Sequence, residues 1–314
     1  MSMDDPIGLN AQGPFDARYV AFLETITTLR PSLHRYCSRM LGSVLDGEDA
    51  VQEALFDAYR KLDSFDDSRR LEPWLFRIAH NRCIDLLRRR GVRIEAEAAV
   101  VAEVFGNREE PPHVAPEMHG REVDKAVEHL VLALPPKERA CVLLKEVFDY
   151  SLEEIAELVD STVGGVKAAL SRGRSKLALL PGVPSMPAAR QEIGPEASRL
   201  LHLYVERFNQ RDWDGLRDLI AADARLCVAD RYFGSFSDAP YLTRYESMTV
   251  PWQMAVGEVD GEPAVIRLQQ KNGIWSARSI IRIVMKDQRI VGVIDYSHCP
   301  WVFASVNALQ VETS

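Results

Sequence analysis

The stretch KERACVLLKEVFDYSLEEIAELVDSTVGGVKAALSRGRSKLALL, residues 137–180, combines two helix patterns with a short turn between them. Ser151 is followed three residues later by Glu154, which is the spacing of a capping box at the start of a helix. Asp160 lies where such a turn bends through a left-handed residue, and a second helix begins near Val163. The first helix has one apolar face with a small residue where the second helix crosses it: Leu152, Ile155, Ala156 and Val159. The stretch therefore predicts a helix-turn-helix.

The second helix of this motif is basic. From Ser161 to Leu180 the chain has four basic residues and no acidic one. They are Lys167, Arg172, Arg174 and Lys176. A basic second helix behind a neutral-to-acidic first helix is the electrostatic form of a recognition helix that enters a major groove. The alternative is an ordinary helical hairpin with a solvated basic face, and this segment favours DNA binding over it.

Length and composition limit the remaining possibilities. The chain has 314 residues, which predicts two or three domains, and its net charge of −8 restricts any DNA contact to local basic patches. Five scattered cysteines without a CxxC spacing indicate buried thiols in a reducing compartment, with no disulfide frame, metal site or cofactor. No signal-peptide core and no run of about 18 apolar residues is present, so we expect a cytoplasmic protein without a membrane segment.

Residues 15–90 have helical periodicity throughout, with no alternating strand pattern. A helix that opens at Asp46 has acids in its first turn, where the helix dipole favours them. One face of this helix is polar with a single aromatic: Asp49, Gln52, Glu53 and Phe56. This face is either solvated surface or a docking surface for a partner helix, and the residues alone leave both interpretations open.

The next helix, residues 73–90, is rich in arginine. Between Arg69 and Arg93 there are eight Arg and no Lys, against two acids. A solvated helix is the simplest explanation, yet arginine alone favours phosphate contacts, because its guanidinium fork binds phosphate in a bidentate way. Phe65, Trp74 and Asn81 lie nearby and have the side chains that contact unstacked bases.

Composition also divides the chain into domains. Residues 92–120 combine glutamates with prolines, which predicts an acidic, mostly extended linker, and residues 181–195 form a proline-rich linker. The predicted domains are therefore residues 15–91, 121–180 and 196–311.

Residues 196–311 begin with two amphipathic helices, Glu196–Asn209 and Trp213–Ala221. Strand patterns come next, the later ones joined by hairpin turns: Arg225–Val228, Trp252–Val259, Pro263–Gln270, Trp275–Met285 and Ile290–Tyr296. This order of elements resembles the SnoaL-like cone fold of polyketide cyclases and ketosteroid isomerases. The predicted fold class is multidomain: two all-α modules, the second a helix-turn-helix, and a C-terminal α+β cone-like domain.

An isomerase of this fold needs a carboxylate base in an apolar pocket and an oxyanion donor. The candidate pocket residues are Tyr232, Trp252, Asp295 and Tyr296. A strand end and ordinary core aromatics explain the same residues without a site. Because a fold does not imply a function, we predict that the chain is not an enzyme. Whether the cone binds a small ligand stays open.

Three segments, in this order, resemble bacterial sigma factors of the extracytoplasmic-function group. DGEDAVQEALFDAY, residues 46–59, is similar to the polymerase-clamp segment of that family. PWLFRIAHNRCIDLLRRR, residues 73–90, is similar to its minus-ten segment, and residues 134–177 are similar to its minus-thirty-five reader. Some members of this group carry a SnoaL-like domain at the C-terminus.

The resemblance implies a sigma factor that binds core RNA polymerase, recognises two promoter elements and initiates transcription. It assigns polymerase contacts to Asp49, Gln52, Glu53 and Phe56. It assigns the melted minus-ten strand to Phe65, Asn81, Arg82, Arg88 and Arg89. It assigns the minus-thirty-five duplex to Thr162, Lys167, Arg172, Arg174 and Lys176.

The chain departs from the family at two places. Positions that often carry polar base-reading residues are Ala168 and Ala169, and Ala229–Gly234 replaces the usual Asp-Gly-Gly-Gly-Lys stretch. We expect the C-terminal domain to regulate activity in cis, and the sequence leaves open whether it activates or inhibits. A separate anti-sigma protein or a small ligand is a further possible partner.

Two other functions remain as alternatives. One is a one-component regulator with a ligand-sensing cone, and the other is a cyclase or isomerase with helical appendages. The arginine-rich helix and residues 46–59 argue against the regulator, because a repressor needs neither.

Overall fold

The computed structural model describes residues 14–65, 70–105, 134–179, 194–229, 231–306 and 308–312. Three helices form the first helical module: α1 (Pro14–Leu41), α2 (Val44–Arg60) and α3 (Leu71–Phe105), with a short 3-10 turn, η1 (Leu62–Ser64), before α3. The second helical module contains α5 (Pro136–Glu146), α6 (Leu152–Leu158) and α7 (Val163–Leu179). A sheet domain with its own helices comes after them. Residues 106–120 of the first predicted linker and 181–193 of the second lie outside the described residues.

Local chemistry explains where the helices of the first module begin and end. The Ser43 hydroxyl caps α2 by accepting a hydrogen bond from the Asp46 amide at 3.1 Å. Gly47 allows α2 to pack closely on α1, because a Cβ there would lie 2.7 Å from the Cα of Ser38. The structure differs from the sequence-based interpretation at residue 92, since α3 continues to Phe105 where an extended linker was expected. Residues 92–105 contain no proline or glycine and are rich in alanine and glutamate, which favours a helix.

The second module is the helix-turn-helix predicted from residues 137–180. Ser151 and Glu154 form a complete capping box at the start of α6. Asp160 has a φ of 49°, so the turn bends through a left-handed residue as expected. Gly173 lets α7 pack against α5, because a Cβ there would lie 2.8 Å from a methyl group of Val142.

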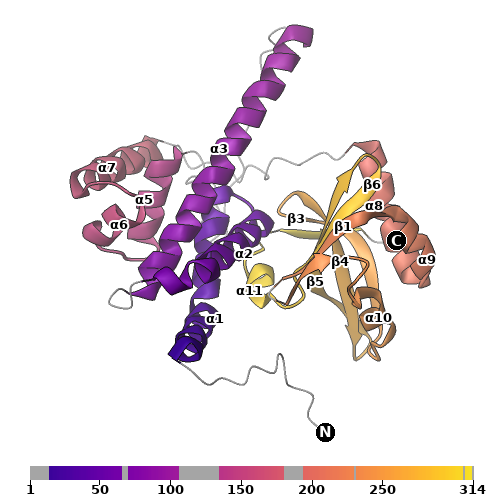
Figure 1. Cartoon of the computed structure of the whole chain (residues 1–314). Helices are drawn as coiled ribbons and strands as arrows, with labels where there is room; N and C mark the ends of the chain where they lie inside the picture. Colours follow the sequence, from indigo (N-terminus) through magenta and orange to yellow (C-terminus); the bar gives the residue numbers. More distant parts are fainter. Residues whose placement is uncertain are drawn as a thin grey trace.

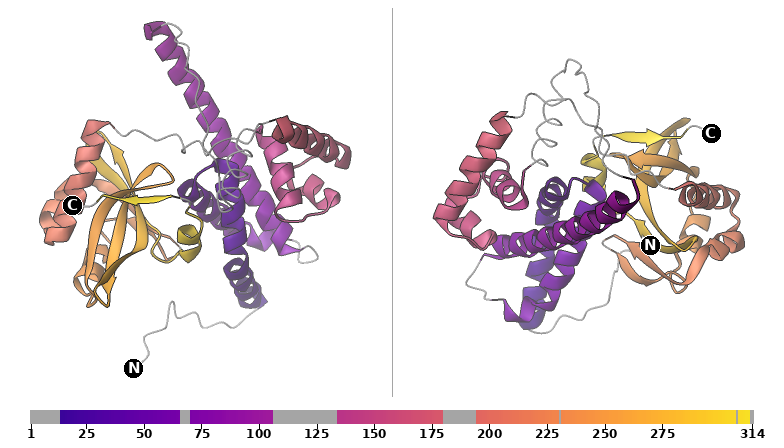
Figure 2. Two further views of the ribbon diagram at one scale, coloured as in Figure 1. Left: turned by 180° about the vertical axis from the view of Figure 1, so that it is seen from behind. Right: turned by 90° about the horizontal axis from the view of Figure 1, so that it is seen from above.

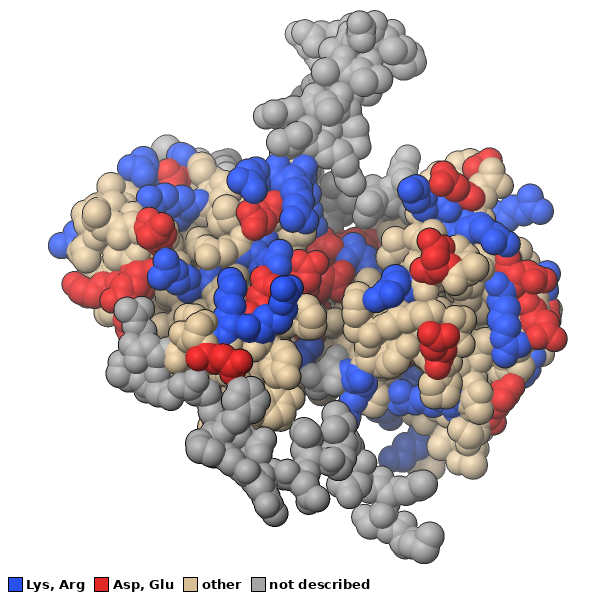
Figure 3. All heavy atoms as spheres, viewed as in Figure 1, with Lys and Arg blue, Asp and Glu red and all other residues tan. Residues whose placement is uncertain are grey.

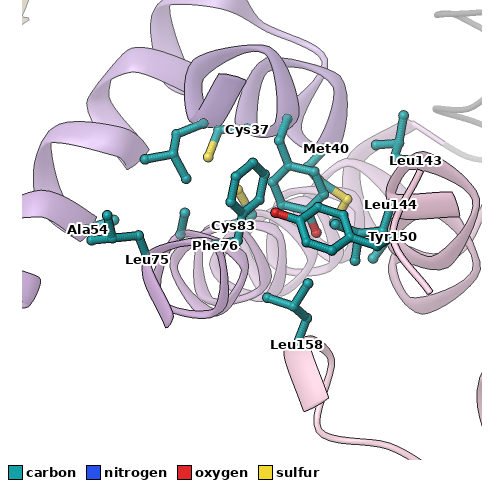
Figure 4. Packing of buried hydrophobic residues seen from close by; sticks show 14 of the residues in the cluster. Cys37, Met40, Ala54, Leu75, Phe76, Cys83, Leu143, Leu144, Tyr150 and Leu158 are labelled. Carbon is teal, nitrogen blue, oxygen red and sulfur yellow. The ribbon is translucent and has the colours of Figure 1, made fainter. Parts of the chain in front are cut away.

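The two helical modules share one hydrophobic core. Tyr36 and Phe76 of the first module lie edge to face with Phe148 of the second, at ring-centroid distances of 5.8 and 5.6 Å. Tyr150 packs 5.5 Å from Phe76 and donates a hydrogen bond to Glu72. Figure 4 shows Tyr150 and residues of α5 facing residues of α1 and α3 across this core. The buried Arg139 of α5 also donates to the carbonyl of Met40 in α1.

The sheet domain begins with α8 (Pro195–Gln210) and α9 (Trp213–Leu219). Its sheet has the strand order β2-β1-β6-β5-β4-β3-β7, antiparallel except for the pair β1 and β6. The strands are β1 (Ile220–Val228), β2 (Tyr232–Ser235), β3 (Trp252–Val259), β4 (Glu262–Lys271), β5 (Ile274–Lys286), β6 (Arg289–Asp295) and β7 (Leu309–Val311). Two short helices complete the domain: α10 (Tyr241–Glu246) and α11 (Pro300–Ala304).

The sheet has a different neighbour on each face. The helices α8, α9 and α10 cover one face and enclose an aromatic core. The other face packs with α11 against the start of α2, where Val44 and Leu45 join the core of the sheet domain. The first module therefore lies between the second module and the sheet domain (Figures 1 and 2). The predicted fold class is confirmed: two all-α modules, the second a helix-turn-helix, and a C-terminal α+β domain.

The buried His80 predicts a stability change in mild acid. Burial lowers the pKa of His80 to about 4, and its Nδ1 lies 2.8 Å from the hydroxyl of Tyr36. The unfolded chain therefore takes up this proton near pH 6.5 and the folded chain does not, so stability present above pH 6.5 is lost as the pH falls toward 4. Between pH 7 and pH 5 we expect this group to remove about 2 kcal/mol from the free energy of unfolding. His80→Asn, which places an amide near Nδ1 but does not titrate, should lose that much less in urea denaturation, and equal losses in both proteins would contradict the assignment.

Candidate functional site

The first turns of α2 carry three acids that all contact the sheet domain or lie beneath it. Asp46, Glu48 and Asp49 come from the segment DGED, and the Ser43 cap together with Gly47 positions this turn against α1. The three carboxylates face β5, α11 and Tyr296, which directly follows β6. Charged atoms of both signs lie along the line where the helical part meets the sheet domain (Figure 3).

Arg282 of β5 is the main cation at this interface. Its Nη1 donates to Asp46 at 2.7 Å and to Asp49 at 3.0 Å, and its Nη2 donates to Glu262 of β4 at 3.3 Å. Arg90 of α3 pairs with the other oxygen of Asp46, and these two arginines hold the pKa of Asp46 below its usual range against the effect of burial. Asp46 thus joins α2, α3 and β5.

Asp49 has a second donor from the sheet domain. The hydroxyl of Tyr296 donates to its Oδ1 at 2.8 Å. Burial beneath the sheet raises the pKa of Asp49 to about 6, although the attraction of Arg282 opposes that rise. The contact therefore carries a desolvation cost at neutral pH, where this carboxylate is ionised.

Glu48 is fully buried and is paired from both sides. Arg30 of α1 donates to it at 2.6 Å, and the indole Nε1 of Trp301 in α11 donates at 2.8 Å. The thiol of Cys299 lies 3.7 Å from the same carboxylate, and the guanidinium of Arg30 lies 5.2 Å from the centroid of the Trp301 ring. A carboxylate inside the first module is thus also an anchor for the sheet domain.

The predicted polymerase-binding residues divide into two pairs along α2. Asp49 is held by Arg282 and Tyr296, and Gln52 accepts a hydrogen bond from the thiol of Cys227 in β1 at 3.0 Å. Glu53 and Phe56, the other pair, are exposed, and 61% of the Phe56 surface is open to solvent. The structure therefore brings the four residues onto one face of α2. The sheet domain contacts Asp49 and Gln52 and leaves Glu53 and Phe56 exposed.

The predicted minus-ten residues lie on α3 and in the loop before it. Arg82 pairs with Asp57 of α2 at 2.6 Å, and Arg88 pairs with Asp85 at 3.2 Å. Asn81 and Arg89 are exposed. Phe65 packs on Trp74 with ring centroids 4.6 Å apart. Asn81, Arg88 and Arg89 are thus the ones that α3 exposes to solvent, and DNA binding by the five residues stays a prediction.

The predicted minus-thirty-five residues lie on or beside α7. Thr162, which accepts from the Gly165 amide at 3.0 Å, and Lys167 are exposed. Three of the basic residues turn back toward α5: Arg172 and Lys176 both reach Glu138 at 2.9 Å, and Arg174 reaches Glu146. Hydrogen bonds from Lys176 and Arg172 lower the pKa of Glu138.

The two alanines at family base-reading positions differ in the structure. Both lie on α7; Ala168 is exposed, whereas Ala169 is fully buried in the core of the module. Ala169 therefore belongs to the core of the module and is not placed to read a base.

Comparison with known proteins identifies the family. A family model for Sigma-70 region 2 matches residues 25–93, and one for Sigma-70, region 4 matches residues 124–177. The ECF RNA polymerase sigma factor SigW of Bacillus subtilis is 33% identical over 165 residues, which are 50% of this chain and 87% of that relative. The chain belongs to the ECF (extracytoplasmic-function) RNA polymerase sigma factors.

Two solved structures also resemble this sigma factor. The extracytoplasmic function sigma factor SigJ of Mycobacterium tuberculosis is 17% identical, covers 90% of this chain and 99% of its own, and has a TM-score of 0.35. A putative ketosteroid isomerase from Kribbella flavida is 21% identical, covers 32% of this chain and 76% of its own, and has a TM-score of 0.26. At these TM-scores neither likeness says anything about the function of the sheet domain.

The candidate ligand residues of the sheet domain do not form one group. The Asp295 carboxylate is buried and accepts hydrogen bonds from Tyr241, Tyr245 and Ser279 at 2.9 to 3.0 Å, and from the Ser297 amide at 2.8 Å. Its neighbour Tyr296 points to the opposite face of the sheet and reaches Asp49, because side chains alternate along a strand.

The other two candidates also have structural roles. Trp252 is buried between Phe208 and Tyr245, and the guanidinium of Arg211 lies 3.5 Å from its ring centroid. The hydroxyl of Tyr232 donates to the carbonyl of Ser235. Among the described residues no group of His, Cys, Asp and Glu is arranged to hold a metal ion. None of the helices in the described ranges is long and apolar enough to cross a membrane.

Sequence reasoning missed the residues of the sheet domain that bind α2. Arg282 carried a usable signal, since it is a lone cation within the apolar run Ile280, Ile281, Ile283 and Val284. Trp301 and Cys227 carried none, because a buried tryptophan or cysteine is ordinary core.

The hydrogen bond between Trp301 and Glu48 can be tested by removing its donor. Trp301→Phe keeps an aromatic ring but loses the indole N–H to a buried carboxylate, which costs about 2 kcal/mol. We expect amide hydrogen exchange of α11 to become roughly 30-fold faster. Trp275→Phe at the exposed tip of β5 is the matched control and should leave this exchange unchanged. Equal exchange in the Trp301 variant and the wild type would show that this bond does not hold the sheet domain.

Proposed function

We propose that this sigma factor binds core RNA polymerase through the outer face of α2, recognises the minus-ten and minus-thirty-five promoter elements through α3 and α7, and initiates transcription. The sheet domain regulates this activity in cis, and its effect is inhibitory. Family membership supports the first part of the proposal. The inhibitory role of the sheet domain is instead supported by contacts within this structure.

The single observation behind the inhibitory assignment is the contact of Arg282 and Tyr296 with Asp49. Asp49 is one of the residues that the resemblance assigns to polymerase binding, and Gln52 beside it is also bound by the sheet domain. While the sheet domain is docked, Arg282 and Tyr296 occupy part of the Asp49 surface that a different protein would contact. Polymerase binding through Asp49 and Gln52 thus requires the sheet domain to leave α2.

The rival functions have less support. The carboxylate of Asp295 already accepts four hydrogen bonds from its own domain, so no oxygen is left to act as a general base. The aromatic side chains around Trp252 pack on one another at centroid distances of 4.9 to 5.7 Å, as core residues do. An operator-binding regulator would leave the acidic face of α2 without a use outside the chain.

Removing the central cation tests the sign of the regulation. Arg282→Ala leaves Asp46 and Asp49 facing the sheet without their shared partner, which weakens docking. Each 1.4 kcal/mol of weakened docking raises the apparent affinity for core polymerase about tenfold, until the undocked form predominates. We expect tighter binding and higher run-off transcription than wild type.

Two further proteins complete this test. Arg278→Ala removes an exposed arginine from the same strand and should behave as wild type. A chain ending at residue 186 should match or exceed Arg282→Ala in transcription. Unchanged output from the shortened chain would exclude regulation in cis, and lower output from both altered proteins would make the sheet domain an activator.

A second prediction concerns the minus-thirty-five contact. Lys167 is exposed on α7, in the half of the helix nearest the turn. If Lys167 binds a phosphate, Lys167→Ala weakens holoenzyme binding to duplexes of different sequence by a similar factor. It also reduces the magnitude of the negative slope of log K against log salt by about one. Lys271→Ala in the β4–β5 hairpin is the control for a lost charge. A slope that stays at the wild-type value would remove Lys167 from the DNA interface.

A further inference from the structure

The outer face of α2 consists of two halves with different surroundings. The covered half contains Asp46, Glu48, Asp49 and Gln52, which bind the sheet domain. The exposed half contains Glu53, Phe56 and Tyr59 on the last turns of the helix. The two halves are continuous, because residues 49, 52, 53 and 56 have the three- and four-residue spacing of one helix face.

The exposed half is chemically suited to a protein partner. Phe56 and Tyr59 expose 61% and 51% of their surface, and the guanidinium of Arg60 lies 5.9 Å from the centroid of the Phe56 ring. Glu53 and Asp57 beside them both pair with Arg82. Neighbouring exposed aromatics fit an apolar partner surface. Since Arg282 satisfies Asp46 and Asp49 in the covered half, a partner that replaces it needs a cation at the same place.

The covered half is held against two costs. Docking raises the pKa of Asp49, so its ionised form is less well solvated beneath the sheet than in water. The side-chain amide nitrogen of Gln52 is buried and has no hydrogen-bond partner among the described residues. A buried unpaired donor disfavours the docked state, because water or another protein would pair it. The sheet domain is therefore attached by a contact that a partner is able to displace.

The distance between the halves is short. Seven residues of α-helix separate Asp49 from Phe56, which corresponds to about 10 Å along the helix axis. A partner seated on Phe56 already lies next to the ion pairs of Arg282. Its own cation then competes with Arg282 at high local concentration, because the second contact forms within one complex.

We propose that core RNA polymerase engages this sigma factor in two steps: it binds first to Glu53, Phe56 and Tyr59, and then displaces Arg282 and Tyr296 from Asp49. This inference rests on the proposed function and adds an order of events to it. The sheet domain acts as a cap that polymerase removes after it has bound.

Association kinetics test the order. With core polymerase in excess, the observed rate for wild type should rise with polymerase concentration and then level off at the rate of displacement. Arg282→Ala should raise that plateau at least tenfold. Tyr296→Phe, which removes only the hydroxyl donor to Asp49, should raise it by a smaller factor. Phe56→Ala should lower the initial slope about tenfold, as for an interface aromatic, and leave the plateau unchanged.

Each other outcome has one meaning. An observed rate that falls as polymerase concentration rises would show that the sheet domain opens before binding, and would overturn the two-step order. A Phe56→Ala slope equal to wild type would overturn it as well, and so would a wild-type rate that rises without a plateau. Arg278→Ala should reproduce the wild-type curve. If no form binds core polymerase, including Arg282→Ala, the sigma-factor proposal itself fails.

Discussion

The structure of this chain depends on a cluster of carboxylates at the start of α2. Asp46, Glu48 and Asp49 lie within four residues, and every one of them accepts a hydrogen bond from a side chain far away in the sequence. A glycine between them brings α2 close to α1, and this places Glu48 within reach of Arg30. The same short segment thus completes the core of the first module and binds the sheet domain.

The energetics of this cluster favour specificity over strength. Burying a carboxylate costs several kcal/mol, and pairing with an arginine returns that cost only when the geometry is good and the remaining lone pairs are satisfied. Glu48 meets this condition through Arg30 and Trp301, which makes its contact with the sheet domain the stronger one. Asp49 meets it less well, as its raised pKa indicates. The contact is consequently weaker at Asp49 than at Glu48, and Asp49 is a residue that the family resemblance assigns to polymerase binding.

Sequence patterns predicted the elements well and the contacts between domains poorly. The capping box at Ser151, the left-handed Asp160 and the five main strands follow from local propensity and alternation, which neighbouring residues determine. The acidic face of α2 was also visible, but its covering was not, because Arg282 lies more than 230 residues from Asp49. Tyr296 was grouped with Asp295 as a pocket residue, although strand alternation directs adjacent side chains to opposite faces. The SnoaL-like order of elements suggested a ligand site on the face of the sheet that α8, α9 and α10 cover. The contact with α2 lies on the opposite face.

The shared core of the helical modules implies a second constraint on the same molecule. Promoter elements named minus-ten and minus-thirty-five lie about 25 base pairs apart, or roughly 85 Å along a duplex. Here α3 and the segment between α5 and α6 belong to modules that pack directly on each other through Phe76, Phe148 and Tyr150. If each module binds its own promoter element, we expect the modules to separate when both elements are bound. Tyr36 and Phe76 belong to the same first module whose α2 binds the sheet domain, so this module holds both of the other parts of the chain.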